Sequence, residues 1–198
     1  MKYTKDWYSE RYYHKGNDCS FIGGYTNYTP EKMGWIYDRA AKHIIETFGT
    51  TEVFDFGTGQ GLMVKAYQDM GIPAYGSDWS DYAVQNAYVK NIIQEDLSQP
   101  LTHERKYDTV QCFDVLEHID EQYSDIAIRN IINRTKRLAL IYIPLLGHPI
   151  DEESHVNLKP RVWWEDRFKG YGLIDSKPYK AHVDWFYYID CMFILYPK

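Results

Sequence analysis

Asp55-Phe56-Gly57-Thr58-Gly59-Gln60-Gly61, residues 55–61, is the most informative stretch of this chain. It follows the apolar pair Val53-Phe54 and leads into a segment with helical character. Glycine has no Cβ, so glycines at alternate positions accept positive φ and let a ligand approach the backbone, and a helix that starts behind them presents free amides. The stretch therefore predicts a strand, a ligand-binding loop and a helix, with a nucleotide-like ligand.

The glycine spacing distinguishes this loop from a dinucleotide-binding loop. A dinucleotide fingerprint is Gly-x-Gly-x-x-Gly, whereas here Leu62 stands at the third glycine position and Gly61 comes one residue early. Asp55 precedes the loop, where it would repel a phosphate but suits the ammonium group of an amino acid. A dehydrogenase is therefore disfavoured.

Strands and helices alternate after this loop. A first helix is predicted between an N-cap at Thr29, with Pro30 at its first position, and a stop at Gly49. Alternation of this kind predicts an α/β fold with a mostly parallel sheet and helices on both faces, and aromatic residues at 185–196 predict closing strands with an antiparallel partner at the sheet edge. Ligands lie beyond the carboxyl ends of parallel strands, where four acidic residues are predicted: Asp55, Asp78, Asp96 and Asp114.

Length and composition limit the possible functions. With 198 residues, 44% of them apolar, we expect one domain: residues 1–49 as an aromatic N-terminal lid and first helix, 50–144 as a cofactor-binding core, and 145–198 as an acceptor-side loop and closing strands. The absence of a long apolar run or signal peptide predicts a cytoplasmic protein without a membrane partner. Three widely spaced cysteines, Cys19, Cys112 and Cys191, are interpreted as reduced buried thiols.

The charge distribution disfavours nucleic acid as a partner. A formal net charge of −6 argues against sequence-independent nucleic-acid binding. The densest basic stretch, residues 129–137 with Arg134 and Lys136, is interpreted as a solvated helix end that leads into a strand.

Four stretches in order, spanning residues 53 to about 143, resemble the motifs of class I S-adenosylmethionine-dependent methyltransferases. The resemblance implies a Rossmann-like three-layer sandwich with a mostly parallel seven-stranded sheet and an antiparallel C-terminal strand. It also implies S-adenosyl-L-methionine as cofactor and S-adenosyl-L-homocysteine as product. The residues that we expect to bind the cofactor are Asp55, Gly57, Thr58, Gly59, Gly61, Asp78, Trp79, Asp96, Leu97, Phe113 and Tyr25.

Individual residues have alternative interpretations. Asp78 is placed to accept hydrogen bonds from both ribose hydroxyls, because an ionised carboxylate offers two acceptor oxygens. Trp79 covers the adenine or belongs to the core, and Asp96 reads the adenine amino group or forms a turn. Tyr25 lies in a tyrosine-rich N-terminus that either closes over the cofactor or packs on the sheet.

The stretch Asp114-Val115-Leu116-Glu117-His118 resembles motif IV of small-molecule methyltransferases. His118, His155 and Glu117 are the candidate catalytic residues. His118 is a candidate base or a structural brace paired with Glu117, and His155 is a second candidate for a base or acceptor-positioning residue or an exposed loop histidine. Trp163 and Trp164 either wall the acceptor pocket or start a helix as core residues.

A divalent cation is a further hypothesis, although it is not favoured and no residue is assigned as a metal ligand. Asp114, Glu117 and His118 stand at i, i+3 and i+4, and His148 and His155 follow in a later loop. The pattern resembles the Glu-x-x-Glu-His sites of ubiquinone-pathway O-methyltransferases and of small-RNA 3′-terminal methyltransferases, but Asp114 replaces the first Glu.

The leading hypothesis is methyl transfer to O or N of a small-molecule acceptor by a monomer or homodimer. A metal-assisted 2′-O nucleic-acid methyltransferase is one alternative, and base amino methylation is disfavoured because Phe113-Asp114-Val115-Leu116 replaces an Asn/Asp-Pro-Pro-Tyr/Phe motif. A non-catalytic nucleotide-binding protein of the same fold is the other.

Overall fold

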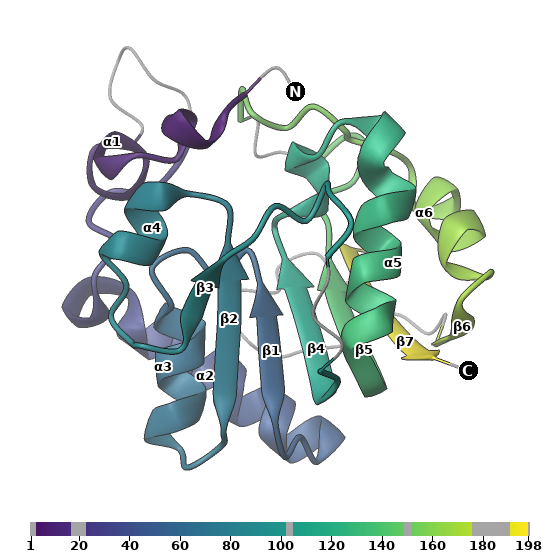
Figure 1. Ribbon diagram of the computed structural model, residues 1–198, viewed down its shortest axis with the longest axis horizontal. Helices are drawn as coiled ribbons and strands as arrows, with labels where there is room; N and C mark the ends of the chain where they lie inside the picture. Colours follow the sequence, from purple (N-terminus) through teal and green to yellow (C-terminus); the bar gives the residue numbers. More distant parts are fainter. Residues whose placement is uncertain (1–2, 17–22, 102–104, 149–151, 176–190, 198) are drawn as a thin grey trace.

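The computed structural model describes residues 3–16, 23–101, 105–148, 152–175 and 191–197. These residues form one sheet of seven strands in the order β3-β2-β1-β4-β5-β7-β6 (Figure 1). The strands are β1 (Val53–Phe56), β2 (Ala74–Asp78), β3 (Ile92–Gln94), β4 (Tyr107–Phe113), β5 (Thr135–Tyr142), β6 (Gly172–Asp175) and β7 (Met192–Pro197). The α-helices are α1 (Glu10–His14), α2 (Pro30–Phe48), α3 (Leu62–Asp69), α4 (Asp81–Gln85), α5 (Ser124–Arg134) and α6 (Arg161–Phe168).

The strand directions confirm the predicted sheet type. β7 runs antiparallel to both of its neighbours, β5 and β6, whereas β1 to β5 pair in parallel. The polypeptide crosses back between β3 and β4, because β1 pairs with β2 on one side and with β4 on the other. In such a sheet the carboxyl ends of β1 and β4 border the place where strand order reverses, which is where ligands bind.

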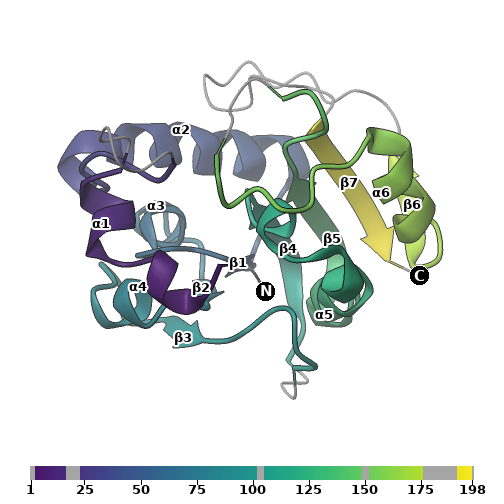
Figure 2. The same cartoon turned by 90° about the horizontal axis from the view of Figure 1, so that it is seen from above.

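Two apolar clusters cover the two faces of the sheet. Successive side chains of a strand point to opposite faces, so Val53 enters the cluster under α2 and α3, while Phe54 and Phe56 enter the cluster under α5 and α6. Figure 2, seen from above, shows α2 and α3 on one side of the sheet and α5 on the other. The fold is therefore the predicted three-layer α/β sandwich.

Local signals place α2 as expected. Thr29 is its N-cap, and the Thr29 side chain accepts a hydrogen bond of 3.3 Å from the Lys32 amide. Pro30 takes the first helical position, and Gly49 ends the helix in the left-handed region at φ 61°.

The C-terminal part differs in detail from the expectation. Residues 185–190 of the predicted closing strands lie outside the described residues, and β7 covers the remainder. β6 was not predicted, because four residues beginning with Gly172 carry too little alternation to indicate a strand. Cys112 and Cys191 are buried free thiols, as expected, and Cys19 lies outside the described residues.

The interpretation of the basic stretch 129–137 as a solvated helix end is wrong for Arg134. Its side chain is only 3% exposed and forms an ion pair with Glu95. A local charge pattern cannot show that a distant carboxylate will meet this guanidinium. Within the described ranges, no helix has the length and apolar character needed to cross a membrane. The cytoplasmic location stays a prediction.

Candidate active site

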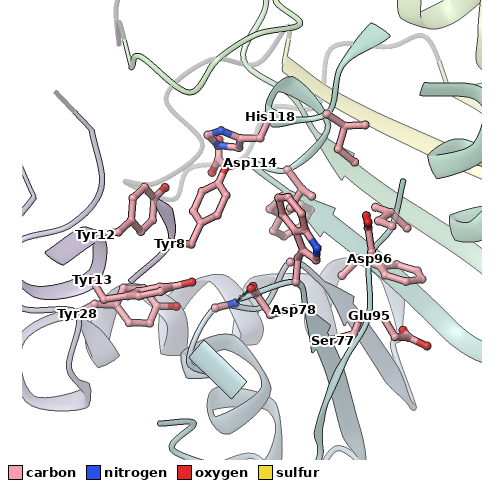
Figure 3. A pocket seen from close by; sticks show the side chains of 18 of the residues that line it. Tyr8, Tyr12, Tyr13, Tyr28, Ser77, Asp78, Glu95, Asp96, Asp114 and His118 are labelled. Atoms are coloured by element: carbon pink, nitrogen blue, oxygen red, sulfur yellow. Dashed lines mark hydrogen bonds between the residues drawn. The ribbon is translucent and has the colours of Figure 1, made fainter. Parts of the chain in front are cut away.

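A cavity opens at the carboxyl ends of the central strands, beneath the N-terminal segment (Figure 3). Its empty space, including the open mouth, is about 850 Å³. Predicted cofactor residues that line it are Gly57, Gly59, Asp78, Trp79, Asp96, Leu97, Phe113 and Tyr25. Asp55 and Thr58 line a smaller hollow that shares Gly57, Tyr25 and Phe113 with this cavity.

The glycine loop lies between the two hollows, and Gly57 lines both. Gly57 and Gly59 have positive φ of 70° and 58°, and the Gly57 and Thr58 amides both donate to the Ser77 carbonyl. A Cβ on Gly57 would lie 2.2 Å from Cγ2 of Val115, so the loop must be glycine there to meet the segment after β4. Gly61 lines neither cavity and instead caps the start of α3 at φ 85°.

Asp78 joins the glycine loop to the end of β2. Its Oδ2 accepts a hydrogen bond of 2.8 Å from the Gly59 amide, and its Oδ1 accepts one of 2.8 Å from the Ser80 amide. Burial raises the pKa of Asp78, and the amide donors of Ser80 and Gly59 oppose that shift. Each carboxylate oxygen has two lone pairs, so acceptor capacity remains on both for a ligand in the cavity.

Trp79 and Asp96 lie on the side of the cavity next to β2 and β3. Trp79 lines the cavity and belongs to neither apolar cluster, so the core interpretation is not supported. Asp96 forms a turn, because its Oδ1 accepts from the amide and hydroxyl of Ser98, and it also lines the cavity; its contact with adenine stays a prediction.

Asp55 lies in the smaller hollow beside the glycine loop. Burial raises its pKa to about 7, partly opposed by hydrogen bonds with Thr58 and Gln111. A carboxyl group of this kind ionises readily when a cation binds beside it.

One buried carboxylate and two partly buried imidazoles cluster beside the main cavity, and His118 of this cluster lines it. Glu117 and His118 come from a 3₁₀ turn, η2 (Leu116–His118), and His155 comes from the loop after β5. Oε1 of Glu117 lies 3.7 Å from Nε2 of His118 and 4.0 Å from Nε2 of His155. The Asn157 amide donates to the Glu117 carbonyl and ties this loop to η2.

The hydrogen bonds of the cluster fix the state of His118. Its Nδ1 lies 3.1 Å from the Ser154 carbonyl oxygen, which can only accept, so Nδ1 carries the proton and the Nε2 lone pair faces Glu117. Burial lowers the pKa of His118 to about 4, so the ring is neutral at pH 7. Glu117 is fully buried, and among the described residues none donates a hydrogen bond to either of its carboxylate oxygens.

An uncompensated carboxylate in this position is unfavourable. Burial, and next the charge of Asp114, raise the pKa of Glu117 well above its usual value. Burial also raises the pKa of Asp114 to about 7. The neutral form of the Glu117 carboxyl is therefore favoured in the free protein, and its donor atoms, with those of His118 and His155, lie close enough together to hold a metal ion.

Asp114 and His148 do not join the compact group of donor atoms. Donor atoms of Glu117, His118 and His155 lie within 4.8 Å of one another, and this group does not include Asp114 or His148. Asp114 takes a left-handed φ of 54°, which interrupts the expected helical turn. Asp114 instead lines both hollows.

Sequence reasoning missed several residues of the site. Tyr8 packs edge-on against His118 with ring centroids 5.8 Å apart, and Figure 3 shows Tyr8 beside His118 and Asp114. Glu152, whose carboxylate accepts from the Gly24 amide, comes within 4.0 Å of His155. The density of N-terminal tyrosines was the available signal for a covering segment, but it did not identify which rings enter the cavity.

The tryptophan pair lies away from the cavity. Trp164 is fully buried in the cluster under α6, and Trp163 packs against the same cluster. Both residues lie on α6 and neither lines the main cavity, which favours the interpretation as helix and core residues.

Comparisons with known proteins agree with this geometry. Residues 25–175 match the family model described as "Methyltransferase domain". A ubiquinone biosynthesis O-methyltransferase from Rickettsia bellii is 25% identical over 134 residues, covering 58% of this chain and 55% of the relative. The chain thus spans about half the length of the curated relatives that it matches.

Two solved structures share the fold at low identity. A SAM-dependent methyltransferase from Archaeoglobus fulgidus superposes with a TM-score of 0.59 at 17% identity, covering 74% of each chain. Magnesium protoporphyrin IX methyltransferase from Synechocystis, solved with bound SAH, superposes with a TM-score of 0.53 at 22% identity, covering 83% of each chain.

Proposed function

This chain belongs to the methyltransferase-domain family, and we propose that it transfers a methyl group from S-adenosylmethionine to an oxygen of a small-molecule acceptor. The observation that carries the proposal is the position of the Glu117 cluster beside a cavity that Gly57 and Gly59 of the glycine loop line. The cofactor supplies an electrophilic methyl group, and the protein supplies alignment and proton handling.

The residues around the cavity fit this cofactor. The Ser77 hydroxyl, which is buried at the cavity wall, has no hydrogen-bond partner among the described residues, so a polar ligand would satisfy it. In the proposal Asp55 binds the ammonium group, Asp78 accepts from the ribose hydroxyls, and Trp79 covers the adenine. Asp114 and His118, which line the same cavity, would then border the space for the acceptor.

The Glu117 cluster is better suited to holding a cation than to supplying His118 as a general base, and a cation favours an oxygen acceptor. A neutral His118 with a pKa of about 4 is a weak base at pH 7. One carboxylate and two imidazoles instead form a mixed donor set for a divalent cation such as Zn²⁺ or Mn²⁺. Glu117, His118 and His155 would hold this cation, and the cation would supply Lewis-acid chemistry toward a hydroxyl acceptor. The O-methyltransferase relative is consistent with this acceptor type.

The acidic net charge continues to disfavour a nucleic-acid acceptor. The buried Glu117 cluster also disfavours a non-catalytic binding protein, because a fold that only binds a nucleotide gains nothing from an uncompensated buried carboxylate. The monomer or homodimer expected from the sequence stays a prediction.

Calorimetry tests the cofactor. S-adenosylmethionine and S-adenosylhomocysteine are expected to bind the wild-type protein, whereas NAD is not. Transfer of a labelled methyl group to a panel of hydroxylated small molecules then tests the activity. Binding of NAD alone would overturn the proposal.

Metal titration tests the cation site independently of activity. Mn²⁺ and Zn²⁺ are expected to bind the wild-type protein saturably, and Glu117→Gln should weaken binding at least tenfold. Glu121→Gln, which alters an exposed acid paired with Lys159, is the matched control and should leave metal affinity unchanged. No saturable binding of either ion, together with activity that EDTA does not change, would exclude the cation.

A further inference from the structure

Residues 95–101 form a loop without regular secondary structure. Two side chains of α5 form hydrogen bonds with this loop. Glu95, Asp96 and Leu97 line the cavity. A loop of this kind has no strand or helix ladder to fix it, so side-chain contacts add to its few backbone hydrogen bonds in setting its position. Arg134 and Asn130 supply these contacts from one face of α5, although neither lines the cavity.

Arg134 holds the start of the loop through a bidentate ion pair. Its Nη1 and Nη2 donate to Oε2 and Oε1 of Glu95 at 2.7 and 2.5 Å. Its guanidinium also lies over the rings of Phe54 and Phe56, 4.5 and 5.2 Å from their centroids. The planar fork fixes the carboxylate in orientation as well as distance.

Asn130 holds the rest of the loop. Its Nδ2 donates to the carbonyls of Leu97 and Gln99 at 2.9 and 2.8 Å, and its Oδ1 accepts from the Leu101 amide at 3.3 Å. The Glu95 amide donates to the Asp78 carbonyl, so the held loop is also joined to the end of β2.

Stability is a weak explanation for this arrangement. The Arg134 and Glu95 side chains are 3% and 7% exposed, and taking both charges out of water offsets much of their attraction. A buried pair of this kind is better explained by the geometry that it imposes on what it holds. Here the ion pair fixes Glu95, which lines the same cavity as Trp79.

We infer that Arg134 and Asn130 are positioning residues that set the loop 95–97 at the distance required to distinguish adenine from other purine bases. The inference rests on the proposed function, because it assigns the base of the cofactor to this side of the cavity. Asp96 presents a carboxylate to the cavity, which accepts from a purine amino group but opposes a carbonyl, and a misplaced Asp96 no longer discriminates the two.

The test compares S-adenosylhomocysteine with S-inosylhomocysteine, in which hypoxanthine replaces adenine. Calorimetry is expected to give at least tenfold tighter binding of the adenine compound to the wild-type protein. Arg134→Lys keeps the charge but loses the fork, and Asn130→Ala removes the second contact. Each should lower this selectivity at least threefold.

Arg137→Lys is the matched control. Arg137 makes the same bidentate contact with Asp108, but at the amino ends of β4 and β5, away from the cavity. It should leave selectivity unchanged. Equal weakening of both ligands in the α5 variants, or no selectivity in the wild-type protein, would overturn the inference. Failure of the wild-type protein to bind S-adenosylhomocysteine would instead overturn the proposed function.

Discussion

The Gly59 amide donates a 2.8 Å hydrogen bond to Oδ2 of Asp78, across 19 residues of sequence. This contact joins the glycine loop after β1 to the acidic end of β2. Asp78 therefore has two tasks in the proposed function: it holds the loop and it accepts from the ribose.

Asp78→Ala should weaken S-adenosylhomocysteine binding at least a hundredfold. Hydrogen bonds to a charged group contribute about 1.5–3 kcal/mol each, and two ribose bonds would be lost. Calorimetry measures the dissociation constant. Asp81→Ala, at an exposed acid paired with Lys5, is the control. A dissociation constant within threefold of wild type in Asp78→Ala would contradict the ribose assignment.

Gly57→Ala should destabilise the fold more than Gly49→Ala. Both glycines have left-handed φ, 70° and 61°, so both variants carry backbone strain of about 1 kcal/mol. Only the new Cβ at Gly57 meets Val115, at 2.2 Å, and overpacking of this kind costs about 1–3 kcal/mol more. Urea unfolding gives both free energies. Equal losses would show that the loop moves away from Val115 freely.

Affinity for S-adenosylhomocysteine should rise between pH 5.5 and 7.5. Burial raises the pKa of Asp55 to about 7, so below that pH the free protein must lose a proton before Asp55 can pair with the ligand ammonium. Calorimetry across this range, in buffers of different ionisation enthalpy, detects the released proton. In Asp55→Asn the affinity should be lower and nearly independent of pH, and the same slope in the variant would exclude Asp55 as its source.

Asp55→Asn should also change how the stability of the ligand-free protein depends on pH. A folded-state pKa above the unfolded value means that the neutral carboxyl is favoured in the fold, so wild-type stability falls as pH rises from about 4 to about 7 and levels off above pH 7. The melting temperature of the variant relative to wild type should therefore increase from pH 5 to pH 8. A constant difference would indicate that Asp55 does not titrate in this window.

Tyr8→Ala should accelerate release of S-adenosylhomocysteine at least tenfold. The Tyr8 ring lies between His118 and Trp79, with centroids 5.8 and 6.5 Å away, so its removal opens the cover of the cavity. Stopped-flow fluorescence measures the release rate. Tyr8→Phe keeps the ring and should stay within threefold of wild type. Equal rates in Tyr8→Ala and wild type would argue against a covering role.

Short-range signals in the sequence predicted much of this fold. Thr29, Pro30 and Gly49 specify the bounds of α2 because capping acts between neighbouring residues. The glycine loop and the acidic strand ends follow from alternation of strands and helices, which places successive carboxyl ends on one rim. These signals also predicted Asp78 and Trp79 in the cavity wall.

The composition of the site required the tertiary structure, because its groups come from separate segments. Glu117 and His155 meet only once the loop after β5 packs on η2, and the left-handed Asp114 leaves the helical pattern that spacing suggested. The local charge pattern predicted a solvated Arg134. In the fold this side chain is buried because it pairs with Glu95, which lies 39 residues away in the sequence. Propensity and periodicity act within a few residues, whereas burial, ion pairing and pKa depend on which distant segments pack together.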